Sequence, residues 1–158
     1  RIFNIVIGGA AGAFPPVIGW SCVTGDISIF PFMLFLIIFV WTPPHFWALA
    51  MYKDVEYSKV NIPMLPVVHG RKVAKIQSFI YSLVLSLVSI APFFIGLTGE
   101  LYLFSSIFLN LIFVFYSCKL LNSKKNENDI FASRLFKFSI LYLYLTFMFF
   151  ILDKIFQI

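Results

Sequence analysis

The residues of this chain best suited to chemistry are one histidine and a cluster of charged side chains eight positions beyond it. Lys53, Asp54, Glu56 and Lys59 fall within seven positions, directly after a long uncharged run. His45 precedes Lys53 by eight residues, which on a helix is about 12 Å along the axis. A carboxylate beside a lysine suits an anionic ligand held through a divalent cation, because Mg²⁺ takes one or two carboxylates together with phosphate oxygens.

The two acids of this cluster are not equivalent. Asp54 and Glu56 are two residues apart, so on a helix they point in different directions and are not expected to chelate one metal together. If the preceding helix continues, Glu56 shares a face with His45 and Lys53. The alternative is that the charges only anchor a helix end at an interface, and for Lys59 this is the preferred interpretation.

The rest of the chain is too apolar for a soluble domain. Of its 158 residues, 61% are hydrophobic and 12% are charged, and the mean hydropathy is +0.95. A soluble domain of this size could not bury so much apolar surface, so lipid must be its solvent. Uncharged runs of roughly 20 residues recur, without the ~10-residue alternation of barrel strands. The sequence predicts an all-α polytopic transmembrane bundle, a single integral-membrane domain over 1–158, with spans at about 4–24, 28–52, 76–98, 101–119 and 135–153.

Loop charges predict the orientation of these spans. The connections at 53–75 and 119–137 each carry five Lys or Arg and two Asp or Glu, whereas the opposite loops hold only Asp26 and Glu100. By the positive-inside rule the basic loops are cytoplasmic. We expect an integral protein of the bacterial inner membrane, or of the mitochondrial inner membrane in a eukaryote, with the catalytic side facing the cytoplasm or matrix. Nucleic-acid binding is not predicted, because no basic patch exists apart from these loops.

Proline pairs interrupt the first two expected spans. The pair at 15–16 is expected to bend the first span, and the pair at 43–44 to free backbone carbonyls in the second, which only protein or a water-filled cavity can cover. Gly8 and Gly12 predict close helix packing, with a smooth wall beside a bulky ligand as the alternative. The connection at 53–75 is long and apolar, which predicts a cap folded over a cavity mouth.

Two interpretations of His45 stay open. The first is a hydrogen-bonded packing residue. The second is a functional group, because an ionisable residue at membrane depth is a functional hypothesis by default. Trp41, Phe46 and Trp47 flank His45 beside the proline pair, which favours the functional interpretation.

Three segments, NIVIGGAAGAFPPVIGW, WTPPHFWALAMY and EYSKVNIPMLPVVHG, resemble in this order the protoheme IX farnesyltransferases (haem O synthases) of the UbiA superfamily of intramembrane prenyltransferases. The resemblance covers essentially the whole chain, and ASRLFKFSILYLYL resembles the family's final span. It implies the C-terminal five helices of a nine-helix fold around a central cavity. These enzymes transfer a farnesyl group from farnesyl diphosphate to a vinyl group of haem B, giving haem O for haem-copper oxidases.

The resemblance implies roles for the charged cluster. Lys53, Glu56 and Tyr57 correspond to catalytic residues of the second acidic motif, with Glu56 as a ligand of Mg²⁺. The family usually has arginine at the position of Lys53 and aspartate at that of Glu56, so the metal or the backbone must shift. Asp54 falls on a position that is not usually acidic. The first acidic motif is not contained in the chain, so this fragment alone is expected to be inactive.

The resemblance also implies where the substrates lie. His45 is expected to orient the porphyrin or to ligate its iron. The aromatic candidates for substrate contact are Trp41, Phe46 and Trp47. The basic candidates for the haem propionates, for which interfacial anchoring is an equal alternative, are Arg71, Lys72 and Arg134. The implied partners are haem B, farnesyl diphosphate and membrane lipid, with haem A synthase as a candidate association.

Other functions fit parts of this pattern. A UbiA-type prenyltransferase with a quinone-precursor or chlorophyll-precursor acceptor would share the metal chemistry, although the segments TPPHFWALA and NIPMLPV favour haem. A non-catalytic haem-binding assembly subunit would use His45 as an axial ligand, and a bis-His site would need His69, a loop residue, at matched depth. A transporter would use the broken helix as a gate, yet no inverted repeat is visible.

Overall fold

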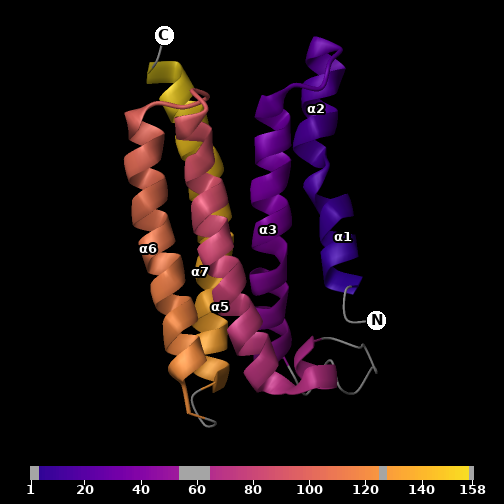
Figure 1. Cartoon of the computed structure of the whole chain (residues 1–158), viewed down its shortest axis with the longest axis vertical. Coiled ribbons are helices and arrows are strands. Elements are labelled where there is room, and N and C mark those ends of the chain that lie inside the picture. The colour runs from indigo at the N-terminus through magenta and orange to yellow at the C-terminus, as the bar shows by residue number, and fades with distance from the viewer. Residues whose placement is uncertain (1–3, 54–64, 125–127, 157–158) are drawn as a thin grey trace.

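The computed structural model describes residues 4–53, 65–124 and 128–156, and helices account for nearly all of them (Figure 1). The helices are α1 (Asn4–Ala13), α2 (Pro15–Thr24), α3 (Ile29–Tyr52), α5 (Leu65–Phe94), α6 (Glu100–Asn122) and α7 (Asn128–Phe156). No strand occurs within these ranges. The predicted all-α fold is therefore confirmed.

Four segments are long and apolar enough to cross a membrane, namely α3, α6, His69–Phe94 of α5 and Asp129–Phe156 of α7. The other expected span, 4–24, is divided at Phe14 into two helices of ten residues each. Pro15 and Pro16 occupy the first turn of α2, where backbone donors have no partner within the helix, so they favour a new helix start. The expected bend is therefore a break between two short helices.

The long helices pack in the order α3, α5, α6 and α7, with α7 returning to α3, while α1 and α2 pack on α3 outside this group (Figure 1). Apolar side chains fill the core and also face outward. On α6, Phe104, Phe108 and Leu111 recur at helical spacing and are all exposed. A stripe of this kind is what a helix presents to lipid, because hydrocarbon is as apolar as the core.

α3 is continuous through Pro43 and Pro44, and both prolines are buried within it. α3 therefore covers the expected span of about 28–52, and the proline pair does not end it. Beside the prolines, the Thr42 hydroxyl donates to the carbonyl oxygen of Ile38 at 2.7 Å, and α1 covers the same turn. Of the two residues whose carbonyls the prolines leave without a donor, Val40 is 7% exposed, so protein covers this part of the helix, as such a sequence at membrane depth requires.

The close helix approach predicted for the first span occurs at Gly9 rather than at Gly8 and Gly12. A Cβ added at Gly9 would lie 2.8 Å from Cγ2 of Thr42, closer than real side chains pack. A Cβ added at Gly8 or Gly12 would meet nothing within 4 Å. Gly9 therefore sets the distance between α1 and α3, and the alternative of a smooth wall at the other two glycines stays a prediction.

α5 begins inside the connection that the sequence assigned to a loop. Its first turn starts at Leu65, which is buried in the core, and the helix is interrupted at Gly70, with φ 83° and ψ 158°. A positive φ favours glycine because it has no Cβ. Figure 1 shows this first turn lying across the lower end of the bundle. Residues 54–64, which hold much of the predicted cap, lie outside the described residues.

The helix ends that border the two basic connections lie at one end of the bundle, the lower end in Figure 1. Ionic and polar contacts join the helices there. Arg71 of α5 forms a salt bridge of 2.7 Å with Asp129 of α7. Lys75 of α5 donates from Nζ to the backbone oxygen and to Oγ of Ser123, at 2.9 and 3.0 Å. The basic residues of this end thus serve in part to connect helices.

Candidate functional site

Trp41 and His45 extend from α3 to a single residue of α7. Residues four apart share a helix face, so both rings can reach α7 together. The indole Nε1 of Trp41 donates to the backbone oxygen of Ser139 at 2.9 Å, and Nδ1 of His45 lies 2.6 Å from the hydroxyl oxygen of the same serine. The two rings are stacked, with centroids 4.2 Å apart and 21° between their planes. Ser139 therefore holds both side chains of the pair.

Two phenylalanines complete the surroundings of the imidazole. The Phe136 ring lies 4.9 Å from it, centroid to centroid, and the Phe46 ring lies 5.2 Å away in an edge-on arrangement. His45 is 9% exposed. It is thus a hydrogen-bonded, packed histidine, as the first interpretation expects. It also lines a pocket, so the second interpretation stays open.

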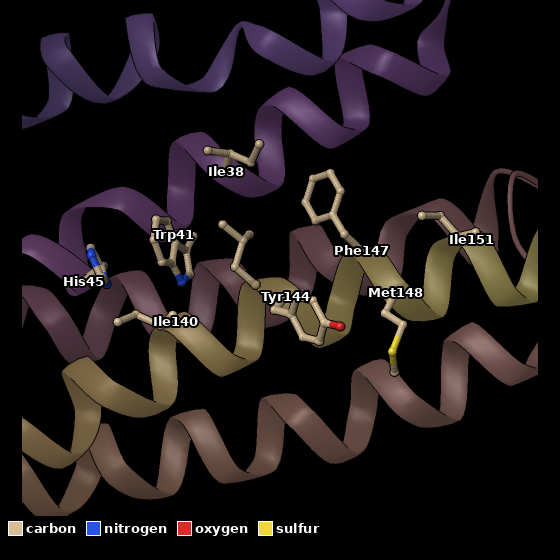
Figure 2. Close-up of a pocket in the computed structure, with 9 residues that line it drawn as sticks. Ile38, Trp41, His45, Ile140, Tyr144, Phe147, Met148 and Ile151 are labelled. Carbon is tan, nitrogen blue, oxygen red and sulfur yellow. The ribbon is translucent and has the colours of Figure 1, made fainter.

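This apolar pocket has a volume of about 660 Å³ and lies between α3 and α7 (Figure 2). Its lining residues are Ile38, Trp41, His45, Ile140, Leu143, Tyr144, Phe147, Met148 and Ile151. Figure 2 shows His45 at one end of the row and Ile151 at the other. A concave, mostly apolar site with a few polar groups is the usual form of a site for a large hydrophobic ligand.

A second apolar pocket of about 670 Å³ continues from the first, since both include Phe147 and Ile151. It extends along α7 to Lys154 and is also lined by Trp20 of α2 and Phe30 of α3. The two pockets together follow α7 from the level of His45 towards the end of the bundle opposite the basic connections.

A third pocket, of about 350 Å³, lies between the end of α3 and the start of α7, and we call it the polar pocket because most of its lining residues are polar or charged. Its lining residues are Tyr52, Asp129, Ile130, Ser133, Arg134 and Lys137. Tyr52 is seven residues after His45, so the two share a face of α3 and are about 10 Å apart along the axis. The α3–α7 face therefore passes from charged groups through His45 to a long apolar groove.

Of the predicted catalytic residues, the structure describes Lys53. It follows the last residue of α3, its backbone N–H donates to the oxygen of Leu49 at 2.8 Å, and its ammonium lies 5.5 Å from the centre of the Tyr52 ring. This places Lys53 next to a residue that lines the polar pocket. Glu56 and Tyr57 lie outside the described residues. α3 ends at Tyr52 and Lys53 is no longer helical, so the continued helix that would place Glu56 on the same face as His45 is not found.

The predicted substrate-binding aromatic residues separate into two groups. Trp41 lines the apolar pocket and Phe46 contacts His45, whereas Trp47 is buried in the core and meets Tyr81 of α5 at 5.3 Å, edge-on. Two residues after His45 correspond to about 200° around a helix, so Trp47 points away from the pocket.

The predicted basic residues occupy different positions at the charged end. Arg134 lines the polar pocket and lies 5.6 Å from the Phe131 ring, Arg71 pairs with Asp129, and Lys72 is exposed on α5. The structure thus brings only Arg134 directly to the polar pocket, together with Lys137, which the sequence analysis left out.

Two site residues of α7, Ser139 and Tyr144, were also missed. Tyr144 belongs to a row with Ile140, Phe147 and Ile151, and that helical spacing was visible in the sequence. Ser139 carried no such signal, because its partner lies 94 positions earlier. Among the described residues, no three or more His, Cys, Asp or Glu are grouped so as to hold a metal ion.

Membrane-length helices define a polytopic integral membrane protein, and the face that runs from a charged end into an apolar groove has the chemistry that an amphiphilic ligand would need. Residues 1–150 match the UbiA prenyltransferase family, and the chain belongs to this family.

Curated relatives indicate a branch of that family. The chain is 51% identical over 152 residues to the protoheme IX farnesyltransferase of Parvibaculum lavamentivorans, covering 96% of this chain and 48% of that protein. It is 50% identical over 140 residues to the enzyme of that name from Nitrosospira multiformis, covering 89% and 46%. It is 47% identical over 158 residues to the enzyme of that name from Acidiphilium cryptum, covering 96% of this chain and 50% of that protein. The chain thus spans about half the length of these relatives. No solved structure matches it.

Proposed function

We propose that this chain is part of a protoheme IX farnesyltransferase, which transfers the farnesyl group of farnesyl diphosphate to a vinyl group of haem B and so forms haem O. The names of relatives about 50% identical to it support this proposal. So does membership of the UbiA prenyltransferase family. The complete protein, about twice as long as this chain, would be the active form.

The observation that carries the proposal is the order of groups along the α3–α7 face. The polar pocket, with Arg134 and Lys137, offers cations to anionic groups such as diphosphate or propionates. The stacked Trp41 and His45 follow, and flat aromatic surfaces suit a porphyrin or an allylic cation. The apolar groove beyond them suits a hydrocarbon chain. Both proposed substrates combine a large apolar body with anionic groups.

In this proposal the residues after α3 act on the leaving group. Lys53 would stabilise the negative charge that develops on diphosphate when the allylic bond ionises, and it would be positioned before that charge develops. Glu56 would hold Mg²⁺ with acidic residues from outside this chain, and the ion would neutralise diphosphate. Tyr57 would face the allylic cation. Exclusion of water by the groove would keep that cation from being quenched before the vinyl carbon of haem B attacks it. The attack would form the new carbon–carbon bond as diphosphate leaves, and water would then add to the carbocation left beside the porphyrin ring, with loss of a proton.

The remaining predicted residues would position haem B. His45 would orient the porphyrin or ligate its iron, with Trp41 and Phe46 as aromatic contacts. Arg134 would meet a propionate at the polar pocket, whereas Arg71 would act through its salt bridge to Asp129. We further propose that the basic end faces the cytoplasm of a bacterial inner membrane, by the positive-inside rule, and that the protein associates with a haem A synthase.

A competition between acceptors tests this function. The full-length protein is incubated with farnesyl diphosphate and Mg²⁺ and offered either haem B or 4-hydroxybenzoate, and the products are separated by chromatography and mass spectrometry. We expect haem O and no prenylated benzoate. Prenylated benzoate without haem O would show that the acceptor is a quinone precursor. Haem binding without any transfer would show an assembly subunit.

A further inference from the structure

The hydrogen bonds of Ser139 determine which nitrogen of His45 carries the proton. The Ser139 hydroxyl donates to the backbone oxygen of Phe136, one turn earlier in α7, at 2.6 Å. A hydroxyl has one proton and two lone pairs, so the same group cannot also donate to His45. The contact of 2.6 Å between Ser139 Oγ and His45 Nδ1 must therefore be donated by the imidazole. A neutral imidazole with its proton on Nδ1 leaves Nε2 as an unprotonated acceptor.

The surroundings of the ring leave little room for any other arrangement. Trp41 stacks on the imidazole at 4.2 Å and is itself held by the backbone oxygen of Ser139, while Phe136 and Phe46 lie at 4.9 and 5.2 Å. The ring is packed by these neighbours and bonded at Nδ1. His45 also lines the apolar pocket, and because Nδ1 is bonded to Ser139 we infer that the edge of the ring that carries Nε2 faces this pocket.

We propose that Ser139 is a positioning residue, which fixes His45 as the Nδ1–H tautomer and presents the Nε2 lone pair to the apolar pocket as a ligand for the iron of a bound metalloporphyrin. A histidine that ligates a metal commonly donates its other N–H to an acceptor of this kind, which orients the ring and raises its basicity. The tautomer rests on the chain's own hydrogen bonds, whereas the metalloporphyrin rests on the proposed function.

Nuclear magnetic resonance tests the tautomer without any ligand. In full-length protein labelled with ¹³C and ¹⁵N at histidine, the His45 signals are those lost in His45→Gln. We expect ring carbon and nitrogen shifts of the Nδ1–H form in the wild-type protein, and loss of that preference in Ser139→Ala. Ser139→Thr keeps a hydroxyl on the same turn and should keep the preference. An Nε2–H form or an imidazolium in the wild-type protein would overturn the proposal.

Titration with haem B tests the ligand. We expect Ser139→Ala to weaken haem binding by about 10- to 100-fold and to alter the absorption spectrum of the bound haem, as loss of a partner to a metal-bound histidine does. Ser139→Thr should restore both. Ser105→Ala is the matched control, because the Ser105 hydroxyl of α6 donates to carbonyl oxygens of its own helix.

The two experiments separate this inference from the proposed function. A confirmed tautomer with identical haem affinity and spectrum in wild type and Ser139→Ala would overturn the assignment of an iron ligand. Haem binding that depends on Ser139, in a protein that forms no haem O, would support the inference and contradict the transferase activity. Formation of haem O by a protein whose His45 is the Nε2–H tautomer would support the transferase activity and contradict the role of Ser139.

Discussion

Tyr142 and Tyr144 stand two residues apart on α7, yet the first is 0% exposed and the second is 65% exposed. The hydroxyl of Tyr142 donates to Oδ1 of Asn110 on α6 at 2.7 Å. Tyr144 lines the apolar pocket between α7 and α3. One helix therefore has two faces that use the same residue type differently. The face towards α5 and α6 pairs its polar groups with one another, and the face towards α3 leaves polar groups beside an open site.

The paired face forms a continuous polar network. Asn110 donates to the hydroxyl of Ser89 on α5 at 2.8 Å, and Tyr102 donates to the backbone oxygen of Ser89 at 2.7 Å. Nearby, the Asp153 carboxylate accepts hydrogen bonds from the backbone N–H groups of Gly99 and Tyr102, at 2.6 and 3.1 Å, at the start of α6. A network whose members satisfy one another specifies how helices pack. We therefore assign stability to this face and ligand binding to the α3–α7 face.

The largest expected effect is on catalysis, and it tests whether activity can be lost without loss of stability. We expect Glu56→Gln to lower turnover of the full-length protein by about 1,000-fold, because the proposed Mg²⁺ site loses its carboxylate charge. Thermal stability should be unchanged. The measurement is Mg²⁺-dependent haem O formation, with Asp54→Asn as the control of near wild-type rate. Equal losses in both variants would contradict the assignment of Glu56 as the metal ligand.

The long helices could be predicted from the sequence because uncharged length is a property of consecutive residues. Expected bounds of 101–119 and 135–153 lie within the helices Glu100–Asn122 and Asn128–Phe156. Local pattern was a poorer guide where tertiary contacts decide the outcome. The two proline pairs illustrate this, because α3 continues through Pro43 and Pro44 whereas a new helix starts at Pro15 and Pro16.

The candidate site was predictable on one helix only. The depth of His45 and its spacing from Trp41 follow from α3 alone. The helical period of α3 also places Trp47 on the opposite side from His45, although Trp47 was expected to contact substrate. Ser139 could not be predicted from the pattern of α3, because its contact with His45 joins residues that are 94 positions apart in the sequence. The role of Asp153 could not be predicted from α7 alone either, because its carboxylate is 2% exposed and accepts hydrogen bonds from the start of α6.

Removal of the Asp153 carboxylate should cause the largest loss of stability. Asp153→Ala leaves two backbone N–H groups at the start of α6 without their acceptor, and we expect the free energy of unfolding to fall by about 3 kcal/mol. Unfolding in detergent, followed by circular dichroism, measures it. The control is Asp26→Ala. Asp26 accepts bonds from Trp20 and Thr24 on an exposed surface, so the loss should be about 0.5 kcal/mol or less. Similar losses of stability in Asp153→Ala and Asp26→Ala would show that burial of the Asp153 carboxylate contributes little to stability.

Contact between α1 and α3 should be sensitive at a single glycine. Gly9→Ala places a methyl group 2.8 Å from Cγ2 of Thr42, and we expect a loss of about 2 kcal/mol in the same unfolding measurement. Gly8→Ala is the matched control on the same helix. A Cβ there meets nothing within 4 Å, so alanine should be neutral or stabilising through its better helix propensity. If both variants behaved alike, close packing at Gly9 would not be what holds α1 on α3.

The smallest expected effect tests the two tyrosines directly. Tyr142→Phe removes one interhelical hydrogen bond within the bundle, and such bonds contribute on average about 0.6 kcal/mol between membrane helices. We therefore expect a small loss of stability and unchanged affinity for haem B.

Tyr144→Phe removes a hydroxyl that lines the pocket, so stability should stay unchanged, and any effect should appear in the binding of haem B or farnesyl diphosphate. Measurement of both quantities in both variants gives a two-by-two comparison. A stability loss in Tyr144→Phe together with a binding loss in Tyr142→Phe would invert the assignment, because the structural face and the binding face of α7 would then have exchanged roles.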